Sequence, residues 1–427
     1  VCIMRAKKDG LSPQRLYNLM QLLYWTGGCA FVGFAAAFLQ EIGFLNAEIG
    51  TISAASSVIG FALMLFVSAR IDRTGGQSAY YALFITVTAQ TLLLPAILCP
   101  GRPCLTVSAG YTLYLSLTQV LGSLVSKIYL DLRGEGMEID FGFARGLGSL
   151  GYALGSLLLG YLLEMLHALP LLLLAHGLFV LLAIAAECIR HNGIHAETAT
   201  SRAEEGGFQI SALSSILKSS PWFLPLVLGI ALVSCANKSL TLFLVNVVQN
   251  VGGSIASFGA LGAFLSFLEV PVIFLFSRFR KKWSVAALLF ASMLFYTLKI
   301  AGYCLAASVG ALWGASLFHA FSTGLLHPAS VEYVRETIPH RNSATAQSMI
   351  NGAPLLFSFF ASIIFGKLLD LNGTDLVLRL LLFLAALGTL ICFLALHRRE
   401  RISRQTIQNL DPPKTSRQKT AAAWRDP

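Results

Sequence analysis

Four charged or titratable residues stand inside apolar stretches of this sequence. Glu269 is the single carboxylate of the run FLSFLEVPVIFLF (residues 264–276), and Lys238, Lys299 and His319 occupy three further apolar stretches. A charge at the centre of a membrane helix costs roughly 2.5 to 3.5 kcal/mol on insertion scales, so such groups usually face a cavity or a partner. A carboxylate in such a place can exchange a proton, and an imidazole titrates near physiological pH. The chemistry predicted by these residues is proton coupling, by Glu269, His319 and Lys299.

The same residues have a second interpretation, which the sequence leaves open. Glu269 can form a permanent salt bridge with Lys299 or Lys238 that pins neighbouring helices, because unpaired charge is costly in a low dielectric. His319 can be a neutral histidine that is hydrogen-bonded inside a helix bundle. Counting about 1.5 Å per residue places Glu269 and His319 near the middle of their helices and the two lysines nearer the outer half.

The elements that position these residues are membrane-spanning helices. Of the 427 residues, 56% are hydrophobic and 12% are charged, against roughly 25% charged residues in an ordinary soluble domain. About 20 apolar residues suffice to cross the hydrocarbon core of a bilayer. We therefore predict an all-α polytopic membrane protein with twelve transmembrane helices, over residues 17–40, 47–68, 77–99, 105–129, 141–164, 167–188, 221–247, 253–276, 284–306, 308–334, 344–369 and 375–396.

The basic residues predict the orientation of the chain. With twelve spans, one set of connecting segments and both termini hold most of the lysines and arginines, while the opposite set holds Arg102, with Lys367 and Arg379 at span edges. Cytoplasmic segments carry the excess of basic residues. Both termini are therefore expected to be cytoplasmic, in a multi-pass protein of the cell (inner) membrane. The net charge of +10 is spread over separate loops, so no nucleic-acid partner is expected.

The chain divides into two similar halves. The longest polar interval, residues 189–220, separates a six-helix half over residues 1–188 from a second over 221–396, and a basic tail, 397–427, is predicted to be disordered. GYLLE at Gly160–Glu164 and GKLLD at Gly366–Asp370 end corresponding spans, 206 residues apart. Such repeats in transporters enclose a binding site at the midplane between the halves.

One loop connects the sequence to a known family. SARIDRTGG, between the second and third spans, resembles the loop signature of the major facilitator superfamily, with Asp72, Arg73 and Gly75 in its acidic, basic and glycine places. The resemblance implies a conformational gating role for these three residues, through charge contacts at helix ends.

Within that superfamily the chain is most similar to the lactose permease-like branch of proton symporters for oligosaccharides, nucleosides and phenylpropionate. DFGFARGLGSLGYA, residues 140–153, resembles the branch's fifth helix, and the stretches EVP, LKIAG and LFHAF resemble its eighth to tenth helices. The resemblance implies that Arg145 binds substrate, that Tyr152 contacts it, and that Glu269 and His319 belong to the proton and substrate machinery.

Three departures from that branch bear on the solute. Lys127 stands where the sugar permease has a substrate-binding glutamate, Lys238 replaces an aspartate, and Ser322 replaces a proton-carrying glutamate. The resulting excess of cations suggests an anionic solute bound by the guanidinium fork of Arg145, with Tyr152, Lys127 and Lys238 as further substrate-binding residues. A neutral sugar or nucleoside remains the alternative. An i, i+4 pair between Lys127 and Asp131 would remove Lys127 from this set.

These observations predict a secondary active transporter. The first interpretation is a proton-coupled symporter that imports a small organic solute by alternating access, and the others are a proton-antiporting exporter of the same fold and a non-transporting membrane sensor. We expect no enzyme activity, no metal and no cofactor, with the proton gradient as energy source and a monomer in contact with membrane lipid as the functional unit. Cys99 and Cys104 are left open as a disulfide or as two free thiols.

Overall fold

The protein is a bundle of helices in two halves. The computed structural model describes residues 12–74, 77–99, 101–191, 216, 218 and 220–410. Within these ranges every regular element of secondary structure is a helix. The helices of the first half are α1 (Pro13–Gly28), the π-helical turn η1 (Cys29–Gly33), α2 (Ala35–Glu41), α3 (Asn46–Thr74), α4 (Ser78–Leu98), α5 (Leu105–Gly134), α6 (Phe141–Met165) and α7 (Ala168–His191).

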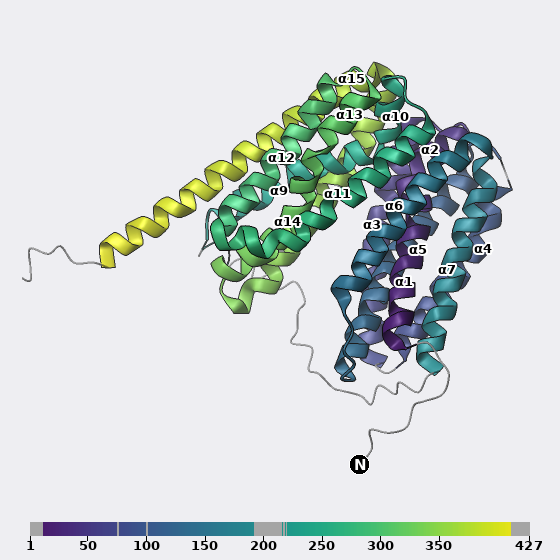
Figure 1. Ribbon diagram of the computed structural model, residues 1–427, viewed down its shortest axis with the longest axis horizontal. Helices are drawn as coiled ribbons and strands as arrows, with labels where there is room; N and C mark the ends of the chain where they lie inside the picture. The colour runs from purple at the N-terminus through teal and green to yellow at the C-terminus, as the bar shows by residue number, and fades with distance from the viewer. Residues whose placement is uncertain are drawn as a thin grey trace, which may run out of the picture.

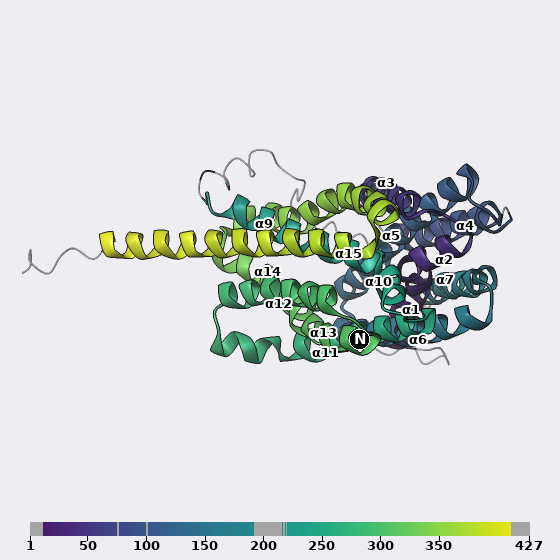
Figure 2. The ribbon, with the colours of Figure 1, turned by 90° about the horizontal axis from the view of Figure 1, so that it is seen from above.

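The second half repeats this order. Its helices are α9 (Phe223–Leu242), α10 (Leu244–Asn250), α11 (Ile255–Lys282), α12 (Val285–Leu305), α13 (Val309–Ser316), α14 (Phe318–Thr337) and α15 (His340–Leu410). Figure 1 shows the first half in purple to teal and the second in green to yellow, side by side. Seen from above, the last arm of α15 extends beyond the rest of the bundle (Figure 2).

The first span of each half is broken at an equivalent place, which the sequence reading did not predict. Phe34 separates η1 from α2 with φ −100° and ψ 12°. Phe243, 209 positions later, separates α9 from α10 with φ −102° and ψ 20°. The two breaks are 209 residues apart, close to the 206 residues that separate the GYLLE and GKLLD motifs. This agreement supports a duplicated six-helix unit.

The number of membrane crossings depends on how the broken helices are divided. Among the described residues, ten helices are long and apolar enough to cross a membrane, or eleven if the bent pair Pro13–Gly33 and Ala35–Glu41 forms one span. The stretch Thr345–Arg401 counts as one of them, yet its 57 residues far exceed the roughly 20 that a crossing requires. It is interrupted at Gly373, whose φ of 75° is not helical. Counting the two arms of this stretch separately, and the bent pair as one span, gives twelve spans, the number predicted from the sequence.

The two halves meet through two helix pairs. α6 packs against α11, and α3 packs against α15. A Cβ built on Gly160 would lie 2.7 Å from the Cα of Gly259, so only glycine permits this approach of α6 to α11. In Figure 1 the halves come together near α2 and α10, and their ribbons diverge toward the beginning of α1.

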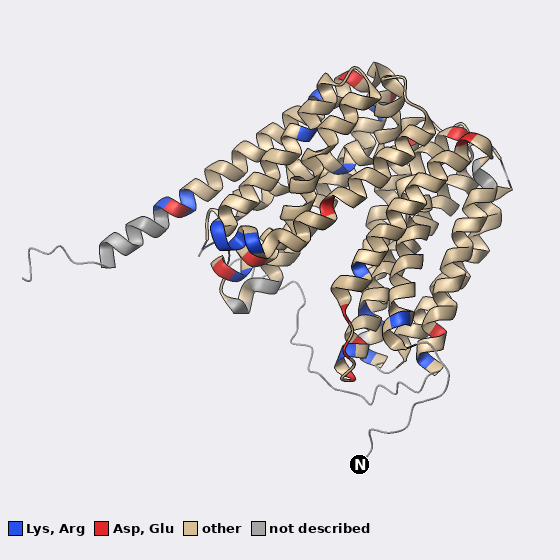
Figure 3. Cartoon of the chain, viewed as in Figure 1, with Lys and Arg blue, Asp and Glu red and all other residues tan. Residues whose placement is uncertain are grey.

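The outer surface of the bundle is suited to lipid. Charged residues gather near the ends of the helices, while the helix middles are almost free of them (Figure 3). Large apolar side chains are exposed along the spans, among them Phe66, Phe84, Leu92 and Phe274. Because a soluble protein rarely exposes so much contiguous apolar surface, hydrocarbon is the medium that this surface fits.

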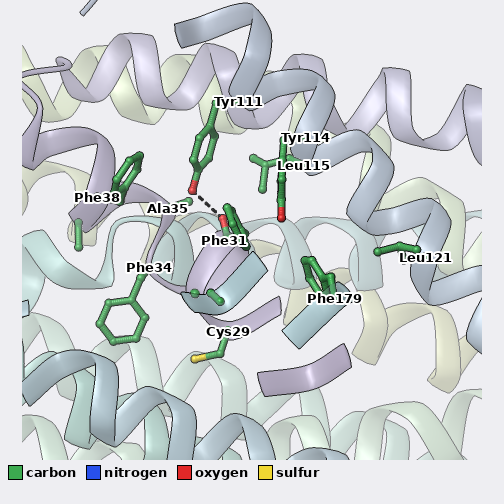
Figure 4. Packing of buried hydrophobic residues seen from close by; sticks show 14 of the residues in the cluster. Cys29, Phe31, Phe34, Ala35, Phe38, Tyr111, Tyr114, Leu115, Leu121 and Phe179 are labelled. Carbon is green, nitrogen blue, oxygen red and sulfur yellow. Dashed lines mark hydrogen bonds between the residues drawn. The ribbon is translucent and has the colours of Figure 1, made fainter. Parts of the chain in front are cut away.

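Aromatic packing holds the broken first span inside the first half. The ring of Phe31, in η1, stacks on Tyr114 with centroids 4.1 Å apart, and Tyr111 donates a hydrogen bond of 2.8 Å to the Phe31 carbonyl (Figure 4). The Tyr111 hydroxyl thus binds a carbonyl of the π-helical turn from another helix. This contact lies at the break where the sequence pattern showed an uninterrupted span.

The structure differs from the sequence prediction at the C-terminal tail. The tail was predicted to be disordered from residue 397, whereas α15 continues as a helix to Leu410. The guanidinium of Arg399 lies 5.1 Å from the Tyr333 ring and 5.6 Å from the Trp222 ring, which fixes the helix where it leaves the bundle.

Two further predictions concern the cysteines and the linker. Cys99 and Cys104, left open as a disulfide or two thiols, are free thiols. The linker lies outside the described residues except for residues 216, 218 and 220 and the end of α7.

Candidate functional site

Lys299, on α12, is the most deeply buried cation of the described residues. It is 2% exposed, and its Nζ donates a hydrogen bond to Oδ1 of Asn237 on α9. The Nδ1 atom of His319, on α14, lies 3.2 Å from the same Nζ. A buried ammonium without a carboxylate partner is costly. A neutral amide and an imidazole compensate this cost only in part, which is typical of a group that changes its protonation state or its partner.

Two further side chains complete the surroundings of Lys299. The Tyr296 ring, one turn earlier on α12, has its centroid 5.4 Å from Nζ, within range of a cation–π interaction. Its hydroxyl lies 2.9 Å from Oγ1 of Thr323, which in turn lies 3.3 Å from Nδ1 of His319. We name Asn237, Tyr296, Lys299, His319 and Thr323 the lysine cluster. It joins α9, α12 and α14 through hydrogen bonds.

Glu269 lies on α11 and is partly buried. Arg145 of the first half and Lys299 of the second are the charges that influence it most. Within the described ranges, however, no cation lies close enough to Glu269 to form an ion pair. The permanent salt bridge that was one interpretation of the sequence is therefore not formed in this conformation. Glu269 stands between the cation of one half and the lysine cluster of the other.

Arg145, on α6, is held in a fixed orientation. Its guanidinium carbon lies 3.9 Å from the Trp25 ring centroid, and its Nη1 donates a hydrogen bond of 2.8 Å to Oγ of Ser149. Stacking on an indole and one hydrogen bond restrict the rotation of a long side chain. The guanidinium therefore presents its remaining N–H groups in one direction.

A row of polar contacts along α1 holds Trp25 itself. Nε1 of Trp25 donates 3.1 Å to Oε1 of Gln21, and Nε2 of Gln21 donates 2.7 Å to the Tyr17 hydroxyl. These residues are spaced by four, so they lie on one helical face. A Cβ on Gly148 would collide with the Trp25 ring, so glycine at this point of α6 makes room for the indole.

The other predicted substrate-binding residues have different surroundings. The Tyr152 hydroxyl lies against Gly33 in η1, and Glu269 influences it electrostatically. Lys127 forms an i, i+4 ion pair of 2.8 Å with Asp131, so this cation is compensated locally. Lys238 is exposed and, with Arg145, influences His327. Glu269 thus influences both Arg145 and Tyr152 electrostatically, whereas Lys127 is paired with Asp131.

The predicted gating residues lie at the end of α3. The helix continues to Thr74, so Asp72 and Arg73 belong to its last turn rather than to a loop. Arg73 is exposed. Gly75 and the side chain of Asp72 lie outside the described residues, so their gating role stays a prediction.

Sequence reasoning did not assign the partners of the predicted residues. The sequence places Trp25 and Asn237 in predicted spans, where they could line a cavity, but it gives no partner for either of them. It assigns no role to Ser149, Tyr296 and Thr323. Their spacing was a usable signal: Ser149 follows Arg145 by four residues, and Thr323 follows His319 by four. On a helix such pairs are neighbours.

Trp25→Ala is expected to raise the solute concentration for half-maximal uptake about 3- to 30-fold, because a partly desolvated cation–π contact contributes roughly 0.5 to 2 kcal/mol. Arg145 would keep its charge but lose the Trp25 ring on which its guanidinium stacks. Trp25→Phe retains a ring and should cost less. Uptake kinetics of the two variants, normalised to the amount of protein in the membrane, test this order. Equal kinetics for Trp25→Ala and the wild type would contradict a positioning role.

The two halves, each with a broken first span, and the buried charged groups between apolar helices describe a helical membrane protein built from a repeated unit. The model of the MFS_1 like family matches residues 16–355, and the chain belongs to that family. No curated protein sequence matches it.

Solved structures show the same fold at low sequence identity. The nucleoside transporter NupG is 15% identical with a TM-score of 0.72, covering 90% of this chain and 97% of NupG; a point mutant of NupG gives a TM-score of 0.74 and covers 98% of that chain. A POT family transporter in complex with a thioalcohol-conjugated peptide is also 15% identical, with a TM-score of 0.65, covering 91% of this chain and 96% of that one. The family and these neighbours are transporters, not enzymes.

Proposed function

We propose that the protein is a proton-coupled symporter that imports a small organic solute by alternating access. The observation that carries the proposal is a carboxylate, Glu269, that forms no ion pair within the described residues, together with a buried cation, Lys299, whose hydrogen-bond partners there are Asn237 and His319. A proton on Glu269 and a proton shared by Lys299 and His319 are alternative ways to balance the charge of this region. The energy source would be the proton gradient, with no cofactor.

The hydrogen bonds between the two halves are consistent with the membrane orientation expected from the sequence. Among the described residues, hydrogen bonds between the halves lie only toward the end of the bundle that contains Asn46, Glu164 and Asp370. We call this the closed end. The basic segments lie at the opposite end, which the distribution of basic residues assigns to the cytoplasm. On this assignment the closed end faces away from the cytoplasm, and we propose that this conformation is the cytoplasm-facing state.

An anionic solute is the class that Arg145 supports. Its guanidinium is already oriented by Trp25 and Ser149, and an oriented guanidinium matches a carboxylate in fork geometry. Lys238, which is exposed, adds a second cation, whereas Arg145 is half-buried. A neutral solute is the second candidate, because the structurally similar NupG is a nucleoside transporter.

Uptake into proteoliposomes with an imposed proton gradient tests this proposal. Labelled aromatic carboxylates, nucleosides and oligosaccharides are offered separately, with the interior more alkaline than the outside. A symporter accumulates its solute above the external concentration, and dissipating the gradient with a protonophore abolishes the accumulation. Loss of preloaded solute against its own gradient under the same conditions would instead indicate the exporter.

A further inference from the structure

The two repeated motifs GYLLE and GKLLD each end in a carboxylate. Their carboxylates, Glu164 at the end of α6 and Asp370 within α15, both lie at the closed end, where the halves meet. Each carboxylate belongs to one half and contacts a helix of the other. The contacts are equivalent in chemistry as well as in position.

Asp370 binds the first turn of α3. Its Oδ1 accepts hydrogen bonds from the backbone N–H (3.0 Å) and side-chain amide (2.8 Å) of Asn46, and its Oδ2 accepts one from the N–H of Ala47 at 2.7 Å. The first backbone N–H groups of a helix have no partner within that helix. A carboxylate at this place also interacts favourably with the helix dipole. Asp370 is therefore an N-terminal cap supplied by the opposite half.

Glu164 makes the corresponding contact with α11. Its Oε1 accepts a hydrogen bond of 3.0 Å from the N–H of Ala256, in the first turn of this helix. Ala256 follows Ala47 by 209 positions, nearly the offset that separates the two carboxylates. Both carboxylates thus cap the first turn of the equivalent helix in the other half.

A glycine four residues before each carboxylate permits this reach. A Cβ on Gly160 would lie 2.7 Å from the Cα of Gly259, and one on Gly366 would lie 3.2 Å from the Cα of Ala47. Small residues at such crossings let helix backbones approach closely. Each motif therefore combines a close helix crossing with a charged cap one turn later.

We propose that Glu164 and Asp370 are a matched pair of gate residues that stabilise the state closed at this end. Separating the halves here breaks both caps in one motion, because each half moves largely as a rigid unit. The free first turns of α3 and α11 and both carboxylates must then be solvated. The pair thereby sets the balance between the two orientations of the transporter, independently of the solute and of proton coupling.

Hydrogen–deuterium exchange of the full-length protein in nanodiscs, without solute, tests the pair. Exchange reports the population of the open state segment by segment. Glu164→Gln is expected to raise exchange about two- to fivefold at residues 255–258, because the neutral amide loses the favourable interaction of the carboxylate with the helix dipole, roughly 0.3 to 1 kcal/mol. It should also raise exchange by a similar factor at residues 46–49, the distant helix N-terminus that Asp370 caps. Asp370→Asn should give the reciprocal result, and the double variant should multiply the two factors at both places if the effects add.

Glu48→Gln is the matched control. Glu48 is a carboxylate at the same end, but its Oε2 accepts a hydrogen bond of 2.9 Å from Leu45 in its own half. Its replacement should leave exchange at residues 255–258 unchanged. Exchange in the middle of α5 shows in parallel that each variant is folded. The proposal is overturned if Glu164→Gln and Asp370→Asn each change exchange only at the helix N-terminus that the substituted residue itself caps.

Discussion

Glu269→Gln is expected to abolish uphill uptake of solute while leaving exchange of solute across the membrane intact. Glutamine has nearly the same shape and can still accept a hydrogen bond, but it cannot carry the exchangeable proton. In this conformation no cation within the described ranges forms an ion pair with Glu269, so the substitution breaks no salt bridge there. Gradient-driven accumulation should fall to the level of protein-free vesicles.

Counterflow distinguishes this outcome from a damaged protein. Vesicles preloaded with unlabelled solute take up labelled solute by exchange, which requires binding and alternating access but no net proton movement. Glu269→Gln should retain counterflow. Ser266→Ala, on the same helix about one turn away, serves as the matched control and should retain both activities. Full accumulation by Glu269→Gln would reject Glu269 as the coupling residue.

Arg145→Lys is expected to weaken solute binding about 10- to 150-fold, because charged hydrogen bonds contribute roughly 1.5 to 3 kcal/mol and a lysine cannot reproduce the planar fork. The charge would remain, but the stack on Trp25 and the bond to Ser149 would be lost. Binding of labelled solute to purified protein measures the effect without reference to transport.

Lys127→Gln is the control for Arg145. Lys127 lies in the same half but is paired with Asp131, so its loss should change solute affinity much less. Near wild-type affinity in Arg145→Lys would show that the solute is not held by a guanidinium fork. It would then favour the neutral solute over the anion.

The sequence was sufficient to predict the helical membrane fold and its two halves. Twelve apolar stretches and the repeated GYLLE and GKLLD motifs carried that prediction, and both depend on properties that are local along the chain. The breaks at Phe34 and Phe243 could not be read in the same way. They depend on partners from other helices, such as the Tyr111 hydroxyl that binds the Phe31 carbonyl.

The site was predicted less completely, for a geometric reason. Counting residues gives depth along a helix but not the direction in which a side chain points, and one residue turns the helix by about 100°. Lys238 and Asn237 are neighbours in sequence, yet Asn237 binds Lys299 and Lys238 is exposed. The expected pairing of Glu269 with Lys299 likewise required relative helix rotations that only the structure supplies.

Solute-driven proton movement tests coupling most directly. Proteoliposomes with equal pH on both sides receive solute outside, and an enclosed pH indicator follows the interior. A symporter with Glu269 as its proton carrier predicts that the interior acidifies in step with solute entry, and that Glu269→Gln shows no acidification. Solute entry into wild-type vesicles without any pH change, or with alkalinisation of the interior, would contradict the account.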